Sequence, residues 1–355
     1  MKALMIAYDL QPPWDNGLKV YGRGLRDSLE NIDGMELTTI ADTNKMEREN
    51  EYDFVHVVQT GVEPFSMALK FFRNAIVFKH IVTPSIGLGN SLSTKLCYSV
   101  INSFQNRLVR CFSSKFVAES YFMHSNLIIP PSINTSTFVN TIQPDEEKIL
   151  SLLDESHVKF GTSNFLKSSN GIVLYSGPLT KDRFPYTRVL NALKQTDSNL
   201  LIVGRATNNG ADRDTVEEII SYAKKFDLES RISIALKLLT EDEKVLLLNF
   251  ADTIIQPFTN NTQLYVAVDP PIFLLEAMSC GKPVITSQTY SFQSLIRNGY
   301  NGYAINWDDP LAVDEALKGC KATSELGLNA RQTILRDFST EYVSKKIQTI
   351  YNDYN

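Results

Sequence analysis

Residues 268–285 read VDPPIFLLEAMSCGKPVI, and this stretch is the most informative about the fold. Two prolines lead into an apolar segment at 272–278, which predicts a short helix after a turn. Gly281 then ends the helix, and the apolar residues at 283–286 predict a buried strand. A helix joined to a strand by such a short turn is typical of a parallel α/β domain.

The same alternation of short apolar runs and helical patterns continues on both sides of this stretch, as parallel βαβ units require. Strands are predicted at 3–8, 37–40, 54–58, 75–78, 110–113, 127–129, 171–176, 199–203, 232–235, 253–256 and 283–286. Helices are predicted at 22–31, 186–194, 215–226, 241–250, 272–278 and 310–318. We therefore expect an α/β protein with two successive doubly wound sheets, a first domain at 1–142 and a second at 143–337, with the linker within 140–170.

Composition agrees with two globular domains. The chain has 355 residues, 43% hydrophobic and 21% charged, which is too long for one ordinary core. Its net charge of −5 argues against a general nucleic-acid-binding protein. The four cysteines form no CxxC pair and are interpreted as reduced structural thiols of a cytoplasmic protein. No apolar run is long enough to span a bilayer.

The predicted helix at 272–278 has features of a nucleotide site. The free N–H groups of Ile272, Phe273 and Leu274 form an anion site at its N-terminus. Glu276 lies one turn further on and faces the same side, where its carboxylate can accept hydrogen bonds from two ribose hydroxyls. The alternative interpretation is a helix with one exposed glutamate and a glycine C-cap.

FLLEAMSCGKPVI resembles the donor-site signature of retaining GT-B glycosyltransferases of the large family 4. Other segments occur in that family's order: MKALMIAYDLQPPWDNGLKVYGRGL, NLIIPPSINTSTF, GIVLYSGPLTKDRF, NLLIVGR, FADTIIQPF and SLIRNGYNGYAI. The resemblance implies a GT-B fold, in which two Rossmann-like domains face a central cleft. Residues 338–355 resemble the terminal helix that crosses back onto the first domain.

The resemblance also implies a function. A sugar moves from a nucleoside-diphosphate sugar to a hydroxyl acceptor, a glycan or a lipid-linked molecule, with retention of the anomeric configuration. The catalytic residues it implies are Arg183, Glu276 and His80. The acceptor side carries Asn16, Gly17 and His80. The donor site carries Gly17, Gly177, Arg183, Gly204, Arg205, Lys237, Asp269, Ile272, Phe273, Leu274 and Glu276.

No cofactor is implied beyond the donor substrate. No Asp-x-Asp motif stands where a metal-dependent transferase needs it, so we expect no essential metal.

Three positions depart from the family pattern. Val268 stands where the family has the first of two glutamates, with Asp269 one residue along. Pro178 replaces an arginine that neutralises the donor phosphates, while Arg183 keeps a cation at its partner position and Arg205 is a candidate replacement. Ser294 replaces a further glutamate.

Several candidate residues have structural interpretations as well. His80, and less strongly His56, follow apolar runs where a lone histidine is often part of a core. Gly17 fits a plain turn, and Lys237 fits a solvated surface.

Two other functions remain open. The three departures favour a non-catalytic GT-B protein that binds a nucleotide sugar or a partner transferase. An epimerase of the same fold is the other alternative, but few acid–base residues are available for it.

Residues 64–118 contain no Asp or Glu, although the whole chain is acidic. Within them, 91–115 mixes apolar residues with Lys95, Arg107 and Arg110, a pattern suited to an interfacial amphipathic helix on an anionic membrane. We therefore expect a cytoplasmic protein that docks on the inner face of the membrane. The alternatives are apolar residues that face the core, or a positive field that serves an acidic substrate.

Overall fold

The computed structural model describes residues 1–12, 16–42, 51–59, 64, 67–68, 74–82, 108–120, 127–140, 146–154, 159–160, 171–205, 211–259, 269–289, 292–322 and 324–354. The chain forms two compact units. Unit 1 comprises Met1–Asn134, Thr262–Ile272 and Arg336–Asn355, and unit 2 comprises Thr135–Asn261 and Phe273–Leu335. Unit 2 thus begins at Thr135, whereas the sequence predicts a boundary at 142.

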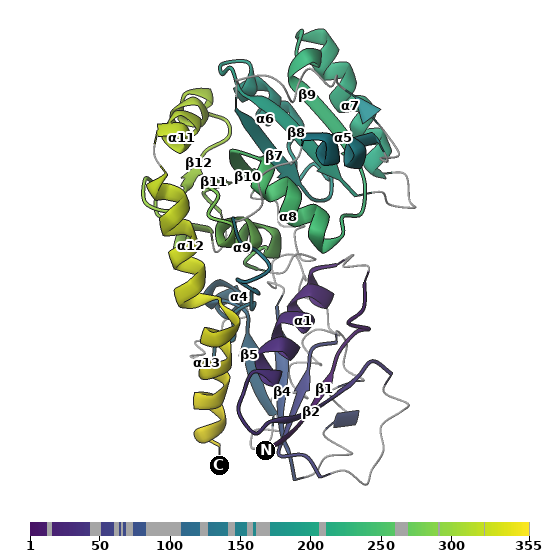
Figure 1. The fold of residues 1–355 in the computed structure, drawn as a ribbon, viewed down its shortest axis with the longest axis vertical. Helices are drawn as coiled ribbons and strands as arrows, with labels where there is room; N and C mark the ends of the chain where they lie inside the picture. The colour runs from purple at the N-terminus through teal and green to yellow at the C-terminus, as the bar shows by residue number, and fades with distance from the viewer. Residues whose placement is uncertain are drawn as a thin grey trace. The chain divides into compact units, whose positions relative to one another are not determined.

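Unit 1 contains a parallel sheet with strand order β2-β1-β3-β4-β5 (Figure 1). Its strands are β1 (Lys2–Ile6), β2 (Glu36–Ile40), β3 (Phe54–Val57), β4 (Ile76–Ile81) and β5 (Leu108–Phe112). The strand predicted at 127–129 is only an isolated bridge between Phe112 and Ile128. The central strand β3 is buried at every position, as expected for a parallel sheet covered on both faces.

Three described helices belong to unit 1: α1 (Gly17–Glu30), α4 (Lys115–Ser120) and α13 (Thr340–Asn352). The C-terminal α13 packs on α1, where the Ser344 hydroxyl donates to the Ser28 carbonyl at 2.8 Å. Tyr351 of α13 stacks on Phe54 of β3 with ring centroids 3.8 Å apart. Helix α13 is therefore part of the core of unit 1.

Unit 2 contains a larger sheet with strand order β12-β11-β10-β7-β8-β9-β6. Its strands are β6 (Lys159–Phe160), β7 (Ile172–Ser176), β8 (Asn199–Gly204), β9 (Ile232–Leu236), β10 (Thr253–Gln256), β11 (Val284–Ser287) and β12 (Tyr303–Ile305). Only β6 runs antiparallel. The chain order changes direction between β7 and β10, and such a switch point opens a crevice at the carboxyl ends of the strands.

The helices of unit 2 are α5 (Glu146–Asp154), α6 (Tyr186–Leu193), α7 (Ala211–Lys225), α8 (Glu241–Phe250), α9 (Ile272–Ser279), α10 (Phe292–Leu295), α11 (Pro310–Ala322) and α12 (Glu325–Asp337), with a 3₁₀ turn at Glu229–Arg231. The predicted helix at 272–278 is α9. Gly281 ends it with φ +68°, and the Lys282 amide donates to the Ala277 carbonyl at 3.1 Å, the closure expected of a glycine C-cap.

The predicted architecture of two doubly wound parallel sheets is confirmed. Cys111, Cys280 and Cys320 are buried free thiols, and Cys97 lies outside the described residues. In the part of the chain that the structure describes, no helix has both the length and the apolar character of a membrane span.

Candidate functional site

The carboxyl ends of β7, β8 and β9 in unit 2 are joined by backbone hydrogen bonds beyond the strands. The Gly177 amide donates to the Val203 carbonyl at 3.1 Å, and the Lys237 amide donates to the Gly204 carbonyl at 3.0 Å. Because the strands are parallel, all three ends lie at one edge of the sheet. The structure therefore brings together the predicted donor residues Gly177, Gly204 and Lys237.

Gly177 and Gly204 both occupy positions that a larger residue fits poorly. Gly177 has φ +154°, and a Cβ atom there would lie 3.1 Å from the Tyr175 hydroxyl. At Gly204 a Cβ atom would lie 2.7 Å from Leu179 and from Leu236. The two loops thus depend on glycine for close packing.

Arg183 and Arg205 lie on neighbouring loops, after β7 and β8. Burial lowers the pKa of the Arg183 guanidinium, and the positive charge of Arg205 lowers it further, against the effect of Tyr175 and Asp182. The Arg183 guanidinium also lies 5.7 Å from the centre of the Phe258 ring. Two positive charges on neighbouring loops, with Arg183 half-buried, favour binding of an anion.

The loop after β7, which contains Pro178, is held by two hydrogen bonds to main-chain carbonyls. The Tyr175 hydroxyl donates to the Pro178 carbonyl at 2.7 Å. Further along, the Thr259 amide donates to the Asp182 carbonyl at 2.7 Å, which ties this loop to the segment after β10. The loop that carries Arg183 is thus fixed on both sides of the switch point.

Glu276 is buried and forms an ion pair that the sequence did not predict. The Lys244 ammonium lies 2.6 Å from Glu276 Oε1, with the two side chains 11% and 2% exposed. Lys244 also lies 5.3 Å from the centre of the Phe138 ring. The exposed glutamate of the alternative interpretation is wrong, because Glu276 is 1% exposed.

Lys237 is engaged as well. Its ammonium lies 2.7 Å from Glu243 Oε1, and Glu243 and Thr240 form a capping box at the start of α8. Burial acts to raise the pKa of Glu243, but hydrogen bonds from Lys237 and Thr240 outweigh it, so the pKa is lowered. Lys237 is therefore an ion-paired residue rather than a freely solvated one.

Ile272, Phe273 and Leu274 form the first turn of α9, as predicted. Upstream of them, Asp269 belongs to unit 1, where its Oδ2 accepts a hydrogen bond from the Ser114 hydroxyl at 2.6 Å. Its carbonyl accepts another from the Ser113 hydroxyl at 2.6 Å. Val268 lies outside the described residues.

His80 lies in a buried chain of hydrogen bonds in unit 1. His80 Nδ1 is 2.9 Å from the Tyr21 hydroxyl, His80 Nε2 is 2.8 Å from His56 Nδ1, and His56 Nε2 is 2.6 Å from the Tyr351 hydroxyl. The Tyr21 hydroxyl donates its proton to the Ile129 carbonyl at 3.1 Å.

The donor and the acceptor in each of these hydrogen bonds follow from the bond between the Tyr21 hydroxyl and the Ile129 carbonyl. Because Tyr21 has one proton and donates it, Tyr21 accepts from His80 Nδ1, and His80 Nε2 then accepts from His56 Nδ1. Tyr351 donates to the remaining nitrogen, His56 Nε2. Both imidazoles are neutral. Burial lowers the pKa of His56 to about 3. Burial also lowers the pKa of His80, and electrostatic interactions with His56 and Lys79 lower it further.

Asn16 and Gly17 start α1. The Asn16 side chain accepts from the Lys19 amide at 2.9 Å as the helix N-cap, and Gly17 is the first helical residue. Asn16, Gly17 and His80 therefore lie toward the carboxyl ends of strands of unit 1. Eight donor candidates lie in unit 2: Gly177, Arg183, Gly204, Arg205, Lys237, Phe273, Leu274 and Glu276.

Sequence reasoning missed Lys244, Tyr21 and Tyr351. Lys244 follows three acidic residues at the start of α8, which resembles a solvated helix face. Of these three residues, only Lys244 could have been found from the sequence. It is a cation four residues after the N-cap of a helix that must bury one face.

Residues 162–332 match the family model of glycosyl transferases group 1. The N-acetyl-alpha-D-glucosaminyl L-malate synthase of Bacillus anthracis is 28% identical over 163 residues, which are 45% of this chain and 38% of that enzyme. The chain thus matches less than half the length of this curated relative.

Solved structures match the chain over nearly its whole length. A complex of HepE from Anabaena with UDP has a TM-score of 0.73 at 16% identity, with 99% of this chain and 100% of that chain covered. A glycosyltransferase from Rickettsia africae has a TM-score of 0.71 at 17% identity, with 99% and 98% covered. These similarities show the fold, that of the GT-B glycosyltransferases. Residues 162–332 therefore match the glycosyl transferases group 1 family within a chain of the GT-B fold.

Proposed function

We propose that the chain is a glycosyltransferase that moves a sugar from a nucleoside-diphosphate sugar to a hydroxyl of a glycan or lipid-linked acceptor, with retention. The observation that carries the proposal is the pair of Arg183 and Arg205 on adjacent loops at the carboxyl edge of the unit 2 sheet. A diphosphate neutralises both charges, and the pair lies within the group 1 domain.

In this proposal the bond between the anomeric carbon and the diphosphate breaks on the face where the acceptor oxygen attacks. The acceptor proton passes to the departing phosphate oxygen. Arg183, Arg205 and the N–H groups of the first turn of α9 stabilise the charge on the leaving group. Glu276 accepts hydrogen bonds from the ribose.

The experiment is a panel of nucleotide sugars that begins with UDP-glucose, because a structure of Anabaena HepE is a complex with UDP-glucose. At 100 times its dissociation constant a donor raises the unfolding free energy by about 2.7 kcal/mol, which a thermal-shift assay detects. Nucleotide release is measured with the same panel, with and without EDTA, since we propose that no metal is essential. A panel in which no nucleotide sugar binds contradicts the proposal.

A second candidate is a non-catalytic protein that binds a nucleotide sugar. Two observations favour it: Pro178 leaves the loop after β7 with one cation fewer than the family has, and Glu276 is already paired with Lys244. The same assays separate the candidates. A binding protein shows a thermal shift with a nucleotide sugar but releases no nucleotide.

A further inference from the structure

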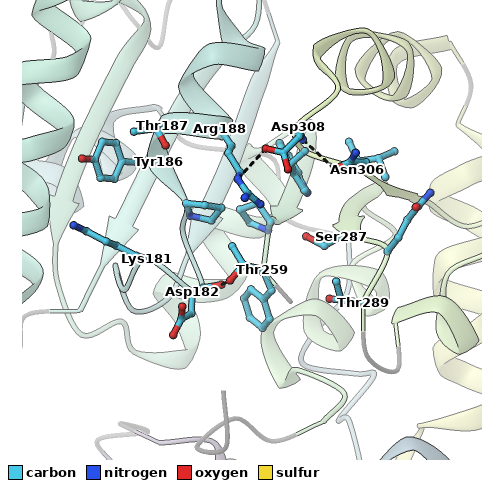
Figure 2. A pocket seen from close by; sticks show the side chains of 16 residues that line it. Lys181, Asp182, Tyr186, Thr187, Arg188, Thr259, Ser287, Thr289, Asn306 and Asp308 are labelled. Carbon is cyan, nitrogen blue, oxygen red and sulfur yellow. Dashed lines mark hydrogen bonds and ion pairs between the residues drawn. The ribbon is translucent and has the colours of Figure 1, made fainter. Parts of the chain in front are cut away.

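Unit 2 contains a pocket of about 910 Å³ that differs from the predicted donor site (Figure 2). It lies at the carboxyl ends of β10, β11 and β12 and at the start of α6. None of the predicted donor residues, all of which are described, lines it. Lys181 and Asp182 line it, however, and the next residue is Arg183, so the pocket borders the loop that carries the predicted phosphate-binding cation.

The walls of this pocket contain polar groups without partners. Ser287 Oγ, Thr289 Oγ1 and Trp307 Nε1 are buried and have no hydrogen-bond partner, and their residues are 4%, 6% and 5% exposed. Figure 2 shows Ser287 and Thr289 on the same side of the pocket, across from Thr259. Native proteins rarely leave such groups unpaired.

These groups are also concentrated in one place. Seven buried side-chain polar atoms lack a partner among the described residues. Five of them belong to residues at the ends of β10, β11 and β12: Gln256, Thr286, Ser287, Thr289 and Trp307. The concentration indicates that this edge of the sheet can bind a polar ligand.

The charges in the pocket indicate the ligand's class. Arg188 pairs with Asp308 at 2.9 Å, a bond drawn in Figure 2, and Lys181 pairs with Glu218 at 3.6 Å. Two cations are thus matched by two carboxylates, so the pocket does not select an anion. What stays unmatched is neutral: two hydroxyls and an indole N–H.

The remaining lining suits a ligand with both polar edges and apolar faces. Asn306 and Gln288 can donate and accept hydrogen bonds, and Tyr186, Phe258 and Trp307 contribute aromatic surface. Sugar rings combine hydroxyls with apolar C–H faces. A volume near the upper end of the usual range for ligand pockets, about 300–1,000 Å³, holds more than one ring.

We propose that this pocket binds a neutral oligosaccharide, at a site separate from the donor site. The sugar hydroxyls bond with Ser287 Oγ and Thr289 Oγ1 once these side chains rotate about χ1 toward the pocket, and the sugar contacts Trp307, which lines the pocket. Binding here does not require catalysis, so the proposal stands or fails independently of the proposed transferase activity.

Trp307 provides a direct readout. The chain contains two tryptophans, Trp14 and Trp307, so the Trp14→Phe protein reports from Trp307 alone. This full-length protein is titrated with neutral trisaccharides of glucose, mannose and N-acetylglucosamine, and separately with UDP and inorganic phosphate. We expect a saturable change in fluorescence with at least one trisaccharide and none with phosphate.

Two further variants test the assignment in the same background. Ser287→Ala with Thr289→Val should weaken trisaccharide binding at least tenfold and leave the dissociation constant for UDP unchanged. Thr286→Val is the matched control, because its hydroxyl is also unpaired but does not line the pocket, and it should bind trisaccharide normally.

Three outcomes overturn the proposal. No trisaccharide in the panel changes the fluorescence; phosphate or UDP changes it and the sugars do not; or the double variant binds sugar as well as the control does. If the double variant only gains thermal stability and no sugar binds, the pocket holds water.

Discussion

The ammonium of Lys244 and the carboxylate of Glu276 form a buried ion pair 2.6 Å long between α8 and α9. Two charges taken out of water depend on each other, because each compensates for the lost hydration of its partner. Glu276 is also the residue proposed to hold the ribose. The pair therefore fixes the position of a proposed binding group before any ligand arrives.

Lys244→Met should destabilise the protein by about 3–5 kcal/mol, because it leaves the Glu276 charge buried without a partner. The double variant Lys244→Met with Glu276→Gln should recover much of this loss. Urea unfolding of the four proteins in the cycle measures the coupling. Additive effects of the two substitutions would show that the pair does not interact in solution.

Glu276→Ala should weaken donor binding by about 1.5–3 kcal/mol for each ribose hydrogen bond lost. Asp314→Ala is the comparison, because it removes a partly buried, ion-paired carboxylate from α11, which carries none of the predicted donor residues. Calorimetric titration with the donor decides the question. An unchanged dissociation constant in Glu276→Ala removes this residue from the donor site.

Arg183→Ala should lower turnover more than donor affinity, since its charge matters most as the phosphate departs. A loss of about 10²–10³-fold in kcat is expected from a single stabilising group. Arg213→Ala, on the exposed side of α7, is the control. If Arg183→Ala has normal turnover and Arg205→Ala has reduced turnover, Arg205 and not Arg183 stabilises the departing phosphate.

Stability should fall as the pH falls below 6.5, because of the two buried histidines. The pKa of His56 is about 3 in the folded protein and about 6.5 in the unfolded chain. Its neutral form thus contributes stability that is complete above pH 6.5 and lost toward pH 3. Each such histidine adds a slope of up to about 1.4 kcal/mol per pH unit. Urea midpoints between pH 4 and 7 should show a shallower slope in His56→Gln, and an equal slope contradicts the prediction.

Membrane docking should depend on lipid charge if the acid-free residues 64–118 bind an anionic surface. Each basic residue near such a surface contributes about 1 kcal/mol. Residues 83–107, with most of the predicted amphipathic helix, lie outside the described residues. The helix predicted at 91–115 is wrong at Leu108–Phe112, because these residues form strand β5, paired with β4 in the sheet of unit 1. Co-sedimentation with anionic and neutral vesicles at low and high salt measures the effect. Binding that ignores both lipid charge and salt, or no binding, contradicts it.

The sequence predicts the strands of both sheets well where an apolar run is long and bounded by turn residues, as in β7 and β10. It does not predict β12, because Tyr303–Ile305 is too short for a periodic signal. The segment between the predicted domains illustrates a different limit. Its polar residues suggest a linker, yet Glu146–Asp154 forms α5, because its apolar residues Ile149, Leu152 and Leu153 are buried by tertiary contacts.

The candidate site also has features that the local sequence predicts and features that it does not. Local pattern locates α9 and Glu276, because helix starts and glycine C-caps are encoded within a few residues. The partners of these groups are not encoded locally. Lys244 lies 32 positions before Glu276, and Tyr351 lies 295 positions after His56. Only the folded chain brings such residues together.

Unit 1 is assembled from segments that lie before and after unit 2 in the sequence, which has a consequence for its biosynthesis. Translation delivers residues 1–134 before unit 2, but His56 Nε2 and the Phe54 ring have their partner, Tyr351, only when α13 has emerged. Chains begin to fold from the N-terminus as they are made. Here the order is inverted: nearly all of unit 2 is available before unit 1 can be completed. Until then, the Phe54 and Phe78 rings of the unit 1 sheet lack the Tyr351 ring that packs on them in the folded protein.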